Sequence, residues 1–434
     1  MKTKGQAMTI RIGLVGTGTV GGGCLDILAN HRDDFKRHYG VDIELARVCS
    51  RKPDAARAHG VEHLFTTDFH EVVTDPSVDL VIELIGGVGA AHDVVCDALR
   101  NGKCVVTANK ALIASAGDEI FALAKENNVD IYYGASVGGG IPIIGPLKHS
   151  LIANGITSVM GIVNGTTNYM LTRMDEDGLS YEDALAEAQA KGYAEADPTA
   201  DVDGFDAAAK IAILASLAFK SRVTMDDVYC EGIRNVSPVD LEAARDMGFS
   251  VKLLALAHRS DAGIDVHVHP TMIPLDHQLS KVNGVNNAIY VTGDAVGETM
   301  FFGMGAGAGP AASAVMGDVV EVARRMEMGL APIFDNDCPD TLPLVPMADL
   351  KTKYYIRFTV ADRPGVLAAM ATVFANHGVS VRSVIQRGET AGVSVEVVYV
   401  THTAREADIQ QVVDEIGQLE DVLMKEPSII RVEA

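Results

Sequence analysis

A glycine-rich turn near the N-terminus constrains the fold more than any other feature of the chain. Gly16, Gly18 and Gly21 have the GxGxxG spacing, with Thr19 and Val20 between the last two, directly after an apolar strand expected over residues 10–15. Glycine at these positions lets the backbone turn sharply and approach a pyrophosphate, which the N–H groups at a helix N-terminus can bind. The alternative is a glycine-rich turn without a ligand. Because a strand precedes the turn and a helical stretch follows it, we interpret it as a dinucleotide-binding unit.

Strands and helices alternate through the first third of the chain. Further strands are expected over residues 42–49, 78–85, 104–108 and 130–133, with helical stretches between them such as 90–99. This alternation predicts an α/β domain of the Rossmann type, a doubly wound parallel sheet. We place it at residues 1–135, completed by a helix around 308–330.

The end of the second strand indicates which dinucleotide is bound. NAD sites usually have a carboxylate at this point, which binds the ribose hydroxyl. Here the strand is followed by Ser50, Arg51 and Lys52. Two cations and a hydroxyl suit a 2′-phosphate, so NADP is favoured over NAD. The alternative is a solvated basic turn.

The composition changes twice along the rest of the chain. Glycines and prolines over residues 134–147 mark the start of a second, α+β domain at 136–307, which we assign to substrate binding, catalysis and dimerisation. A proline-rich segment at 331–352 predicts an exposed linker. Beyond it, residues 353–434 have the element order βαββαβ, which predicts a small ferredoxin-like domain.

Two lysines are candidates for chemistry. Lys210 follows Asp206 by four residues on an otherwise apolar helix, so both side chains lie on one helical face. A structural ion pair is one interpretation, and a functional charge in a buried helix is the other. Lys110 comes directly after the strand at 104–108, where ligands bind in open α/β sheets, although a surface lysine is also consistent with this position.

Composition excludes several classes of partner. The formal net charge of -22 opposes binding to nucleic acid or to an anionic membrane, and no apolar run is long enough to cross a bilayer. The six cysteines contain no CxxC pair, which indicates a reducing, cytoplasmic setting. The natural chain begins at Met1 or at Met8.

Several separate segments resemble the homoserine dehydrogenase family. They are GLVGTGTVG, TANKALI, NGTTNYML and the long signature GYAEADPTADVDGFDAAAKIAILA, and together they extend the resemblance over nearly the whole chain. The segment DRPGVLAAMATVFANHGVSV resembles an ACT domain. The resemblance implies interconversion of L-homoserine and L-aspartate 4-semialdehyde with a nicotinamide cofactor, in threonine, methionine and isoleucine biosynthesis.

The resemblance also implies roles for individual residues. Lys210 would donate the proton, and Lys110 would lie beside the reacting oxygen and the cofactor. Glu195 and Asp206 would hold the ammonium group of the substrate. Hydride arrival at an aldehyde leaves negative charge on oxygen, and a lysine ammonium stabilises that charge.

Cofactor and cation sites are implied in the same way. Gly192 and Gly307 would line the cofactor cleft. A monovalent cation, sodium, would bind the backbone carbonyls of Val137, Gly139 and Ile141. The family commonly has a carboxylate just before this turn, whereas the present chain has Gly134.

The ACT resemblance implies feedback regulation by an amino acid, with threonine the first expectation, and a homodimer or homotetramer. One rival interpretation is a ligand-sensing regulatory protein, which would not need Lys210, Asp206 and Glu195. Another is a phosphorylating semialdehyde dehydrogenase, which requires a nucleophilic cysteine beside a base.

Overall fold

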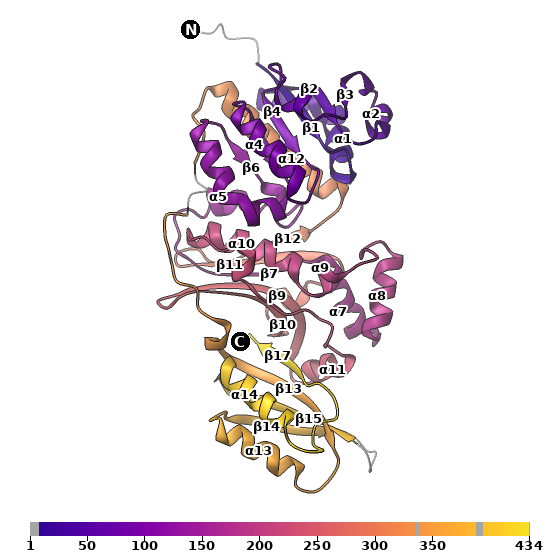
Figure 1. Ribbon diagram of the computed structural model, residues 1–434, viewed down its shortest axis with the longest axis vertical. Helices are drawn as coiled ribbons and strands as arrows, with labels where there is room; N and C mark the ends of the chain where they lie inside the picture. Colours follow the sequence, from indigo (N-terminus) through magenta and orange to yellow (C-terminus); the bar gives the residue numbers. More distant parts are fainter. Residues whose placement is uncertain (1–7, 335–337, 388–393, 434) are drawn as a thin grey trace. The chain divides into compact units, whose positions relative to one another are not determined.

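The structure is a computed structural model that describes residues 8–334, 338–387 and 394–433 (Figure 1). Residues 1–7, with Met1, residues 335–337 of the expected linker, and residues 388–393 and 434 of the expected ferredoxin-like domain lie outside the described residues. The chain forms two compact units. Unit 1 comprises Met1–Val159, Ala212–Asp226 and Asn287–Thr341, and unit 2 comprises Met160–Ile211, Asp227–Asn286 and Leu342–Ala434.

Unit 1 contains the parallel sheet that the glycine turn predicted. Its strands follow the order β3-β2-β1-β4-β5-β6, which is the order of the dinucleotide-binding fold. The strands have the bounds β1 Thr9–Val15, β2 Asp42–Cys49, β3 Phe65–Thr66, β4 Leu80–Glu83, β5 Cys104–Thr107 and β6 Ile131–Tyr132. All four residues of β4 and all four of β5 are buried, as expected for central strands covered on both faces.

Helices cover this sheet in unit 1 (Figure 1). Unit 1 contains the helices α1 Thr19–Asp34, α2 Asp54–Ala58, α3 His70–Val73, α4 Gly89–Arg100, α5 Lys110–Glu126, α6 Ile144–Lys148 and α12 Ala308–Met328. It also has a π-helix at Phe35–Tyr39 and short 3-10 turns at Glu62–Leu64 and Gly134–Ser136. The late helix α12 packs closely on α1, since a Cβ added at Gly23 would lie 2.9 Å from the Ala312 Cβ. The strand β7, Ile156–Ile162, continues from unit 1 into unit 2, and β11 Asn286–Gly293 lies between it and β12 Gly297–Met304.

The first part of unit 2 consists of helices and a long hairpin. The helices are α7 Gly165–Asp177, α8 Tyr181–Ala190, α9 Thr199–Val202, α11 Pro238–Asp246 and α10 Phe205–Phe219, whose last residues belong to unit 1. The strands are β8 Tyr229–Cys230, β9 Phe249–Ser260 and β10 Gly263–Pro274, and 3-10 turns occur at Gln278–Lys281 and Met347–Asp349. A further 3-10 turn, Met225–Asp227, begins in unit 1 and ends in unit 2. Most of α10 is buried, because between Asp206 and Lys220 its only charge is Lys210.

The C-terminal part of unit 2 has the predicted order βαββαβ, with one short extra strand. Its elements are β13 Lys351–Ala361, α13 Val366–Asn376, β14 Val381–Arg387, β15 Ser394–Thr401, β16 Ala404–Arg405, α14 Glu406–Gly417 and β17 Ser428–Val432. Alternate residues of β13 from Tyr354 to Val360 enter a core formed with both helices. Phe374 stacks on Tyr399 in this core, with ring centroids 4.5 Å apart.

This small domain continues the sheet of the β9–β10 hairpin. The strand β17 pairs in parallel with β10 through Thr271 and Arg431, and the order of strands in unit 2 is β9-β10-β17-β13-β15-β14. Asp240 on α11 is fully buried and accepts hydrogen bonds from Tyr355 and Arg357 of β13. The sequence predicted this domain and the linker before it. It did not predict the pairing of β17 with β10, because pairing between strands that are remote in the chain leaves no local sequence pattern.

The linker itself is partly fixed. Most of its described residues are exposed or half-buried, yet the N–H of Ile264 donates to Pro343 O at 2.9 Å and the N–H of Val345 donates to Ile264 O at 2.8 Å. The linker therefore pairs with the start of β10 before it enters β13. Among the described residues, no helix has the length and apolar character needed to span a membrane.

Candidate active site

The glycine turn in unit 1 has the geometry that a dinucleotide requires. Gly16 has a φ of 104°, in the region that favours glycine, and its N–H donates to Cys49 O at 2.9 Å. A Cβ at Gly21 would lie 2.1 Å from Gly16 O, so only glycine allows the helix to begin here. A Cβ at Gly18 would meet no described atom within 4 Å. Open space therefore lies at the N-terminus of α1, where backbone N–H groups can bind a pyrophosphate.

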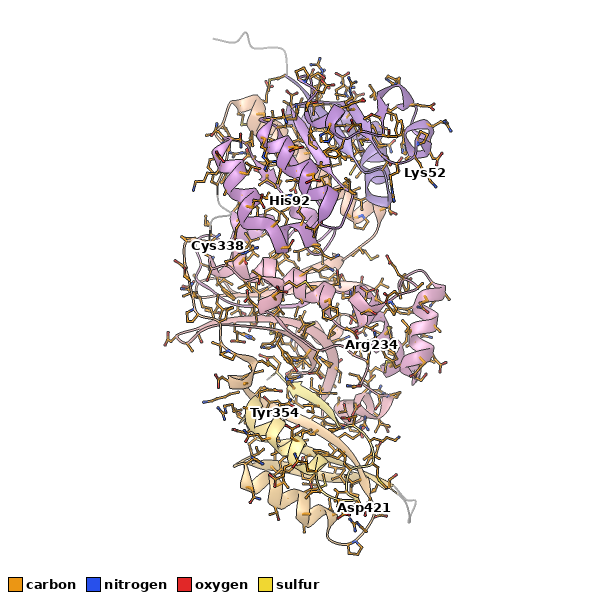
Figure 2. The ribbon with its side chains drawn as sticks, in the orientation of Figure 1. Lys52, His92, Arg234, Cys338, Tyr354 and Asp421 are labelled. Carbon is orange, nitrogen blue, oxygen red and sulfur yellow. The ribbon has the colours of Figure 1, made fainter. Side chains whose placement is uncertain are left out.

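The two cations predicted to select the cofactor are exposed. Arg51 and Lys52 follow β2 after Ser50, and Figure 2 shows Lys52 at the surface of unit 1 near α2. Ser50, half-buried, donates its N–H to Thr66 O at 3.2 Å, which fixes the backbone ahead of the two cations.

Lys110 is held at the carboxyl ends of β4 and β5. It is the first residue of α5, and the Asn109 side chain caps this helix by accepting the Leu112 N–H at 3.1 Å. Thr107 donates its hydroxyl to the buried carboxylate of Glu83 at 2.6 Å. The ends of β4 and β5 therefore fix the start of α5. Lys110, the first residue of this helix, is half-buried.

Unit 2 brings Lys210 and Asp206 together as their spacing predicted. The Lys210 Nζ lies 2.7 Å from Asp206 Oδ2 and donates to Val163 O at 2.6 Å. Both side chains are 11% exposed. This geometry suits both a structural ion pair and a buried functional lysine.

Sequence reasoning missed the residue that positions Asp206. The Asn164 side chain caps α7 by accepting the Thr167 N–H at 2.9 Å, and its amide donates to Asp206 Oδ2 at 2.9 Å and to Asp201 Oδ1 at 2.7 Å. An asparagine between a strand and a helix could have been recognised as a cap from the sequence. Its bonds to two distant aspartates could not.

Glu195 lies in a loop fixed to the same network. The Thr166 hydroxyl donates to Tyr193 O at 2.6 Å and to Asp201 Oδ2 at 3.1 Å. Glu195 follows two residues later, and its side chain is exposed. The loop that carries the Glu195 carboxylate is therefore attached, two residues before Glu195, to the buried network around Asp206.

The two other predicted cofactor residues are at helix ends. Gly192, in unit 2, has a φ of 74° and follows the last turn of α8. Gly307, in unit 1, has a φ of 118° and is the N-cap of α12. Both positions require glycine for local reasons, whatever their role toward a ligand.

Three family models match the chain: homoserine dehydrogenase over residues 142–320, its NAD binding domain over 16–134, and the ACT domain over 354–421. The chain is 47% identical to a homoserine dehydrogenase of Synechocystis sp., over 98% of this chain and 100% of that protein. A homoserine dehydrogenase of Corynebacterium glutamicum is 43% identical, over 99% and 97%. The chain belongs to the homoserine dehydrogenase family. It is an NAD(P)-dependent oxidoreductase that uses a nicotinamide cofactor.

Solved structures agree with this assignment. A homoserine dehydrogenase of Thiobacillus denitrificans has a TM-score of 0.92 at 40% identity, over 98% of each chain. A hyperthermophilic archaeal homoserine dehydrogenase in complex with NADPH has a TM-score of 0.63 at 29% identity, over 73% of this chain and 98% of that one. The fold predicted from the sequence, including the ACT domain, is confirmed.

The departure from the family at Gly134 has a structural counterpart on α12. A Cβ at Gly134 would lie 2.8 Å from the Asp318 carboxylate, which accepts the Gly134 N–H at 2.7 Å. Asp318 therefore occupies the space that a side chain at residue 134 would need. Burial raises the pKa of the Asp318 carboxyl to about 6, although the Gly134 N–H opposes this rise.

The turn that carries the predicted cation ligands is tightly fixed within unit 1. Val137, Gly139 and Ile141 are buried, and a Cβ at Gly139 would lie 2.5 Å from Gly305 O. The carbonyl of Ile141 accepts the Ile143 N–H at 2.9 Å. A carbonyl oxygen has two lone pairs, so this bond leaves one for a cation.

The raised pKa of Asp318 predicts a pH-dependent stability. The unfolded chain ionises this carboxyl near its ordinary pKa of 3.8, whereas the folded protein retains the proton up to a pH of about 6. Between these values the unfolded state binds fewer protons, so stability falls as the pH rises. Asp318→Asn removes this loss and keeps an oxygen that accepts the Gly134 N–H. The variant should gain about 2 kcal/mol over the wild type between about pH 4 and pH 7.

Thermal unfolding of both proteins across this pH range tests the expectation. Asp294→Asn is the matched control, because the exposed Asp294 also accepts a glycine N–H, that of Gly155, at 2.9 Å. A constant melting-temperature difference between Asp318→Asn and the wild type would contradict the account.

Proposed function

We propose that Lys210 is the proton donor of the homoserine dehydrogenase reaction in this chain. Reduction of the aldehyde leaves negative charge on its oxygen, and the Lys210 ammonium stabilises that charge and delivers a proton from Nζ. In the oxidative direction the same nitrogen takes the proton back. The nicotinamide ring of the bound cofactor supplies or receives the hydride.

The hydrogen bonds of Lys210 carry this proposal. A lysine ammonium has three N–H donors, and among the described residues Lys210 uses two, to Val163 O and Asp206 Oδ2. The third is left for a substrate oxygen. The two bonds fix the direction of the third, so the ammonium is oriented before substrate binds.

The carboxylates and Lys110 complete the proposed site. Asp206 and Glu195 bind the substrate ammonium by opposite charge. The family resemblance assigns Lys110, the first residue of α5 in unit 1, to the reacting oxygen and the cofactor. Gly16, Gly18 and Gly21 hold the pyrophosphate, Thr19 and Val20 complete that turn, and Gly192 and Gly307 contact the cofactor.

We infer that NADP is the preferred cofactor. Arg51 and Lys52 are exposed directly after β2, and they offer two positive charges to a 2′-phosphate. The archaeal relative with a similar fold is described in complex with NADPH. NAD, which lacks the phosphate, would gain nothing from these charges.

The thiols of unit 1 and unit 2 disfavour the phosphorylating alternative. That chemistry needs a thiolate, and burial raises the thiol pKa of Cys24 to about 12 and that of Cys104 to about 11. Burial is also the main cause that raises the pKa of Cys49 and Cys230 to about 11. These groups remain protonated at neutral pH.

We also propose a monovalent cation, sodium, on the carbonyls of Val137, Gly139 and Ile141. The fixed backbone of this turn supports the proposal. Asp318 supplies a carboxyl beside Gly134, and the resemblance places a carboxylate just before this turn, where the present chain has Gly134. Equal turnover in sodium chloride and in choline chloride at one ionic strength would count against a functional cation.

The first prediction on function concerns Lys210→Met. Turnover should fall by roughly a hundredfold to ten-thousandfold, the usual contribution of general acid catalysis, while cofactor affinity is kept. Methionine retains the apolar stem, so the protein should fold. Turnover, cofactor affinity and melting temperature are measured on one preparation.

Lys252→Met is the matched control for Lys210→Met. Lys252 is also buried in unit 2 and donates to a backbone carbonyl, that of Val282, at 2.8 Å. Its loss should lower stability with little change in turnover per folded molecule. If the two variants behave alike, with near-normal turnover, Lys210 is a structural residue.

Cofactor selection is tested by replacing both Arg51 and Lys52 with alanine. The KM for NADP should rise by about tenfold or more, and the KM for NAD should change little, because only NADP carries the phosphate. The paired control replaces Lys36 and Arg37, exposed cations of the π-helix. Equal effects on both cofactors would show that Arg51 and Lys52 do not recognise the phosphate.

We propose that an amino acid regulates the enzyme by feedback through its ACT domain. Threonine is the first candidate, because the reaction belongs to threonine, methionine and isoleucine synthesis. Truncation near Leu350 would also remove β17 from β10 and leave Asp240 without Arg357, so the full chain is the better subject. Adding L-threonine should lower turnover by about fivefold or more. Unchanged turnover with threonine and related amino acids would give the domain a structural role.

We infer that the protein forms a homodimer or homotetramer. A monomer in analytical ultracentrifugation would contradict this.

A further inference from the structure

Two histidines and an aspartate meet on the β9–β10 hairpin of unit 2, and the proposed reaction uses none of them. Asp265 pairs directly with His258 across the antiparallel hairpin, and His267 lies two residues further on the same face of β10. His258 Nδ1 and His267 Nε2 are each 3.1 Å from Asp265 Oδ1. Three potential metal ligands therefore lie within 4.8 Å of one another.

Two of the three separations between these ligand atoms match coordination of one ion. Bonds of 2.0–2.1 Å from a tetrahedral zinc ion to nitrogen and oxygen place neighbouring ligand atoms about 3.3 Å apart. The two observed separations of 3.1 Å are close to this value. Hydrogen bonds from both rings to one carboxylate oxygen would have similar lengths, so the surroundings must distinguish the two states.

A cavity of about 430 Å³ lies beside these three residues, and His269 and Glu433 also line it. His267 and His269 are 3% and 2% exposed, and their rings stack with centroids 4.7 Å apart. Among the described residues, His267 Nδ1 and His269 Nε2 have no hydrogen-bond partner. Buried polar atoms are rarely left unpaired, so this cavity is suited to a polar occupant.

The cluster combines the carboxylate of Asp265 with two imidazoles, and charged side chains also line the cavity beside it. Arg431, which also lines the cavity, is already neutralised by Glu406 at 2.6 Å and Glu231 at 2.7 Å. Lys351 and Lys353 line the cavity as well, on β13, and neither is fully buried.

We propose that His258, Asp265 and His267 bind a divalent transition-metal ion, with zinc the first choice for two imidazoles and a carboxylate. The fourth coordination position opens to the cavity and is filled by water. Glu433 Oε1 lies 4.0 Å from Nε2, the other nitrogen of the His258 ring.

A second cluster of potential metal ligands must be removed by mutation before zinc binding is assigned to the β9–β10 hairpin. In unit 1, His92 Nε2 lies 3.5 Å from Cys96 Sγ and 3.1 Å from Glu119 Oε2, and Figure 2 marks His92 on α4. Burial raises the pKa of the Cys96 thiol, which disfavours the thiolate that zinc binds. His92→Gln abolishes this cluster and serves as the parent protein for the test.

The test is a calorimetric titration of the full-length, metal-stripped His92→Gln protein with zinc chloride. We expect one site, and we expect added His258→Gln or Asp265→Asn to raise its Kd by about tenfold or more. His402→Gln replaces an exposed histidine of the same unit and should leave the Kd unchanged. Circular dichroism confirms that each variant is folded, and Asp265→Asn, which keeps the side-chain size, replaces His258→Gln if the latter does not fold.

Cobalt provides a readout that is independent of affinity. Cobalt bound to the His92→Gln parent by nitrogen and oxygen should show visible bands without the charge-transfer band of a thiolate ligand, and these bands should be lost with His258→Gln. Absence of zinc binding in the parent, an unchanged Kd in folded His258→Gln and Asp265→Asn, or a thiolate band in the parent would each overturn the proposal.

Discussion

The buried ion pair of Lys210 and Asp206 is the interaction on which the account of unit 2 depends. Two opposite charges on an apolar helix are costly to remove from water, and their attraction offsets that cost only if the remaining hydrogen bonds are made. Val163 O and the Asn164 amide make those bonds. The cap of α7, the turn after β7 and the first turn of α10 are therefore fixed by one polar network.

The network also explains how a flexible lysine becomes a directed donor. Asn164 binds Asp206 and Asp201 at once, and Thr166 connects Asp201 to the loop before Glu195. Each member is oriented by the next, so a chain of hydrogen bonds fixes the position of the Lys210 ammonium. Removing any one of them would leave another buried polar group without its partner.

Sequence reasoning predicted the features that depend on local pattern. The strand at 42–49 is observed as β2 with the same bounds, and the i,i+4 spacing correctly placed Asp206 and Lys210 side by side. It missed contacts between distant segments. Asn164 lies 42 residues from Asp206, Asp318 lies 184 from Gly134, and the pairing of β10 with β17 joins two predicted domains. No periodicity or capping signal specifies such partners, because they arise only when the chain packs.

The reaction itself is the most direct test of the central claim. Purified protein is mixed with L-homoserine and NADP+, and the absorbance of the reduced cofactor is followed, with and without inorganic phosphate. The account predicts that homoserine alone reduces the cofactor, that phosphate has no effect, and that a carbonyl reagent traps an aldehyde. No reduction, or reduction that requires phosphate, would contradict it.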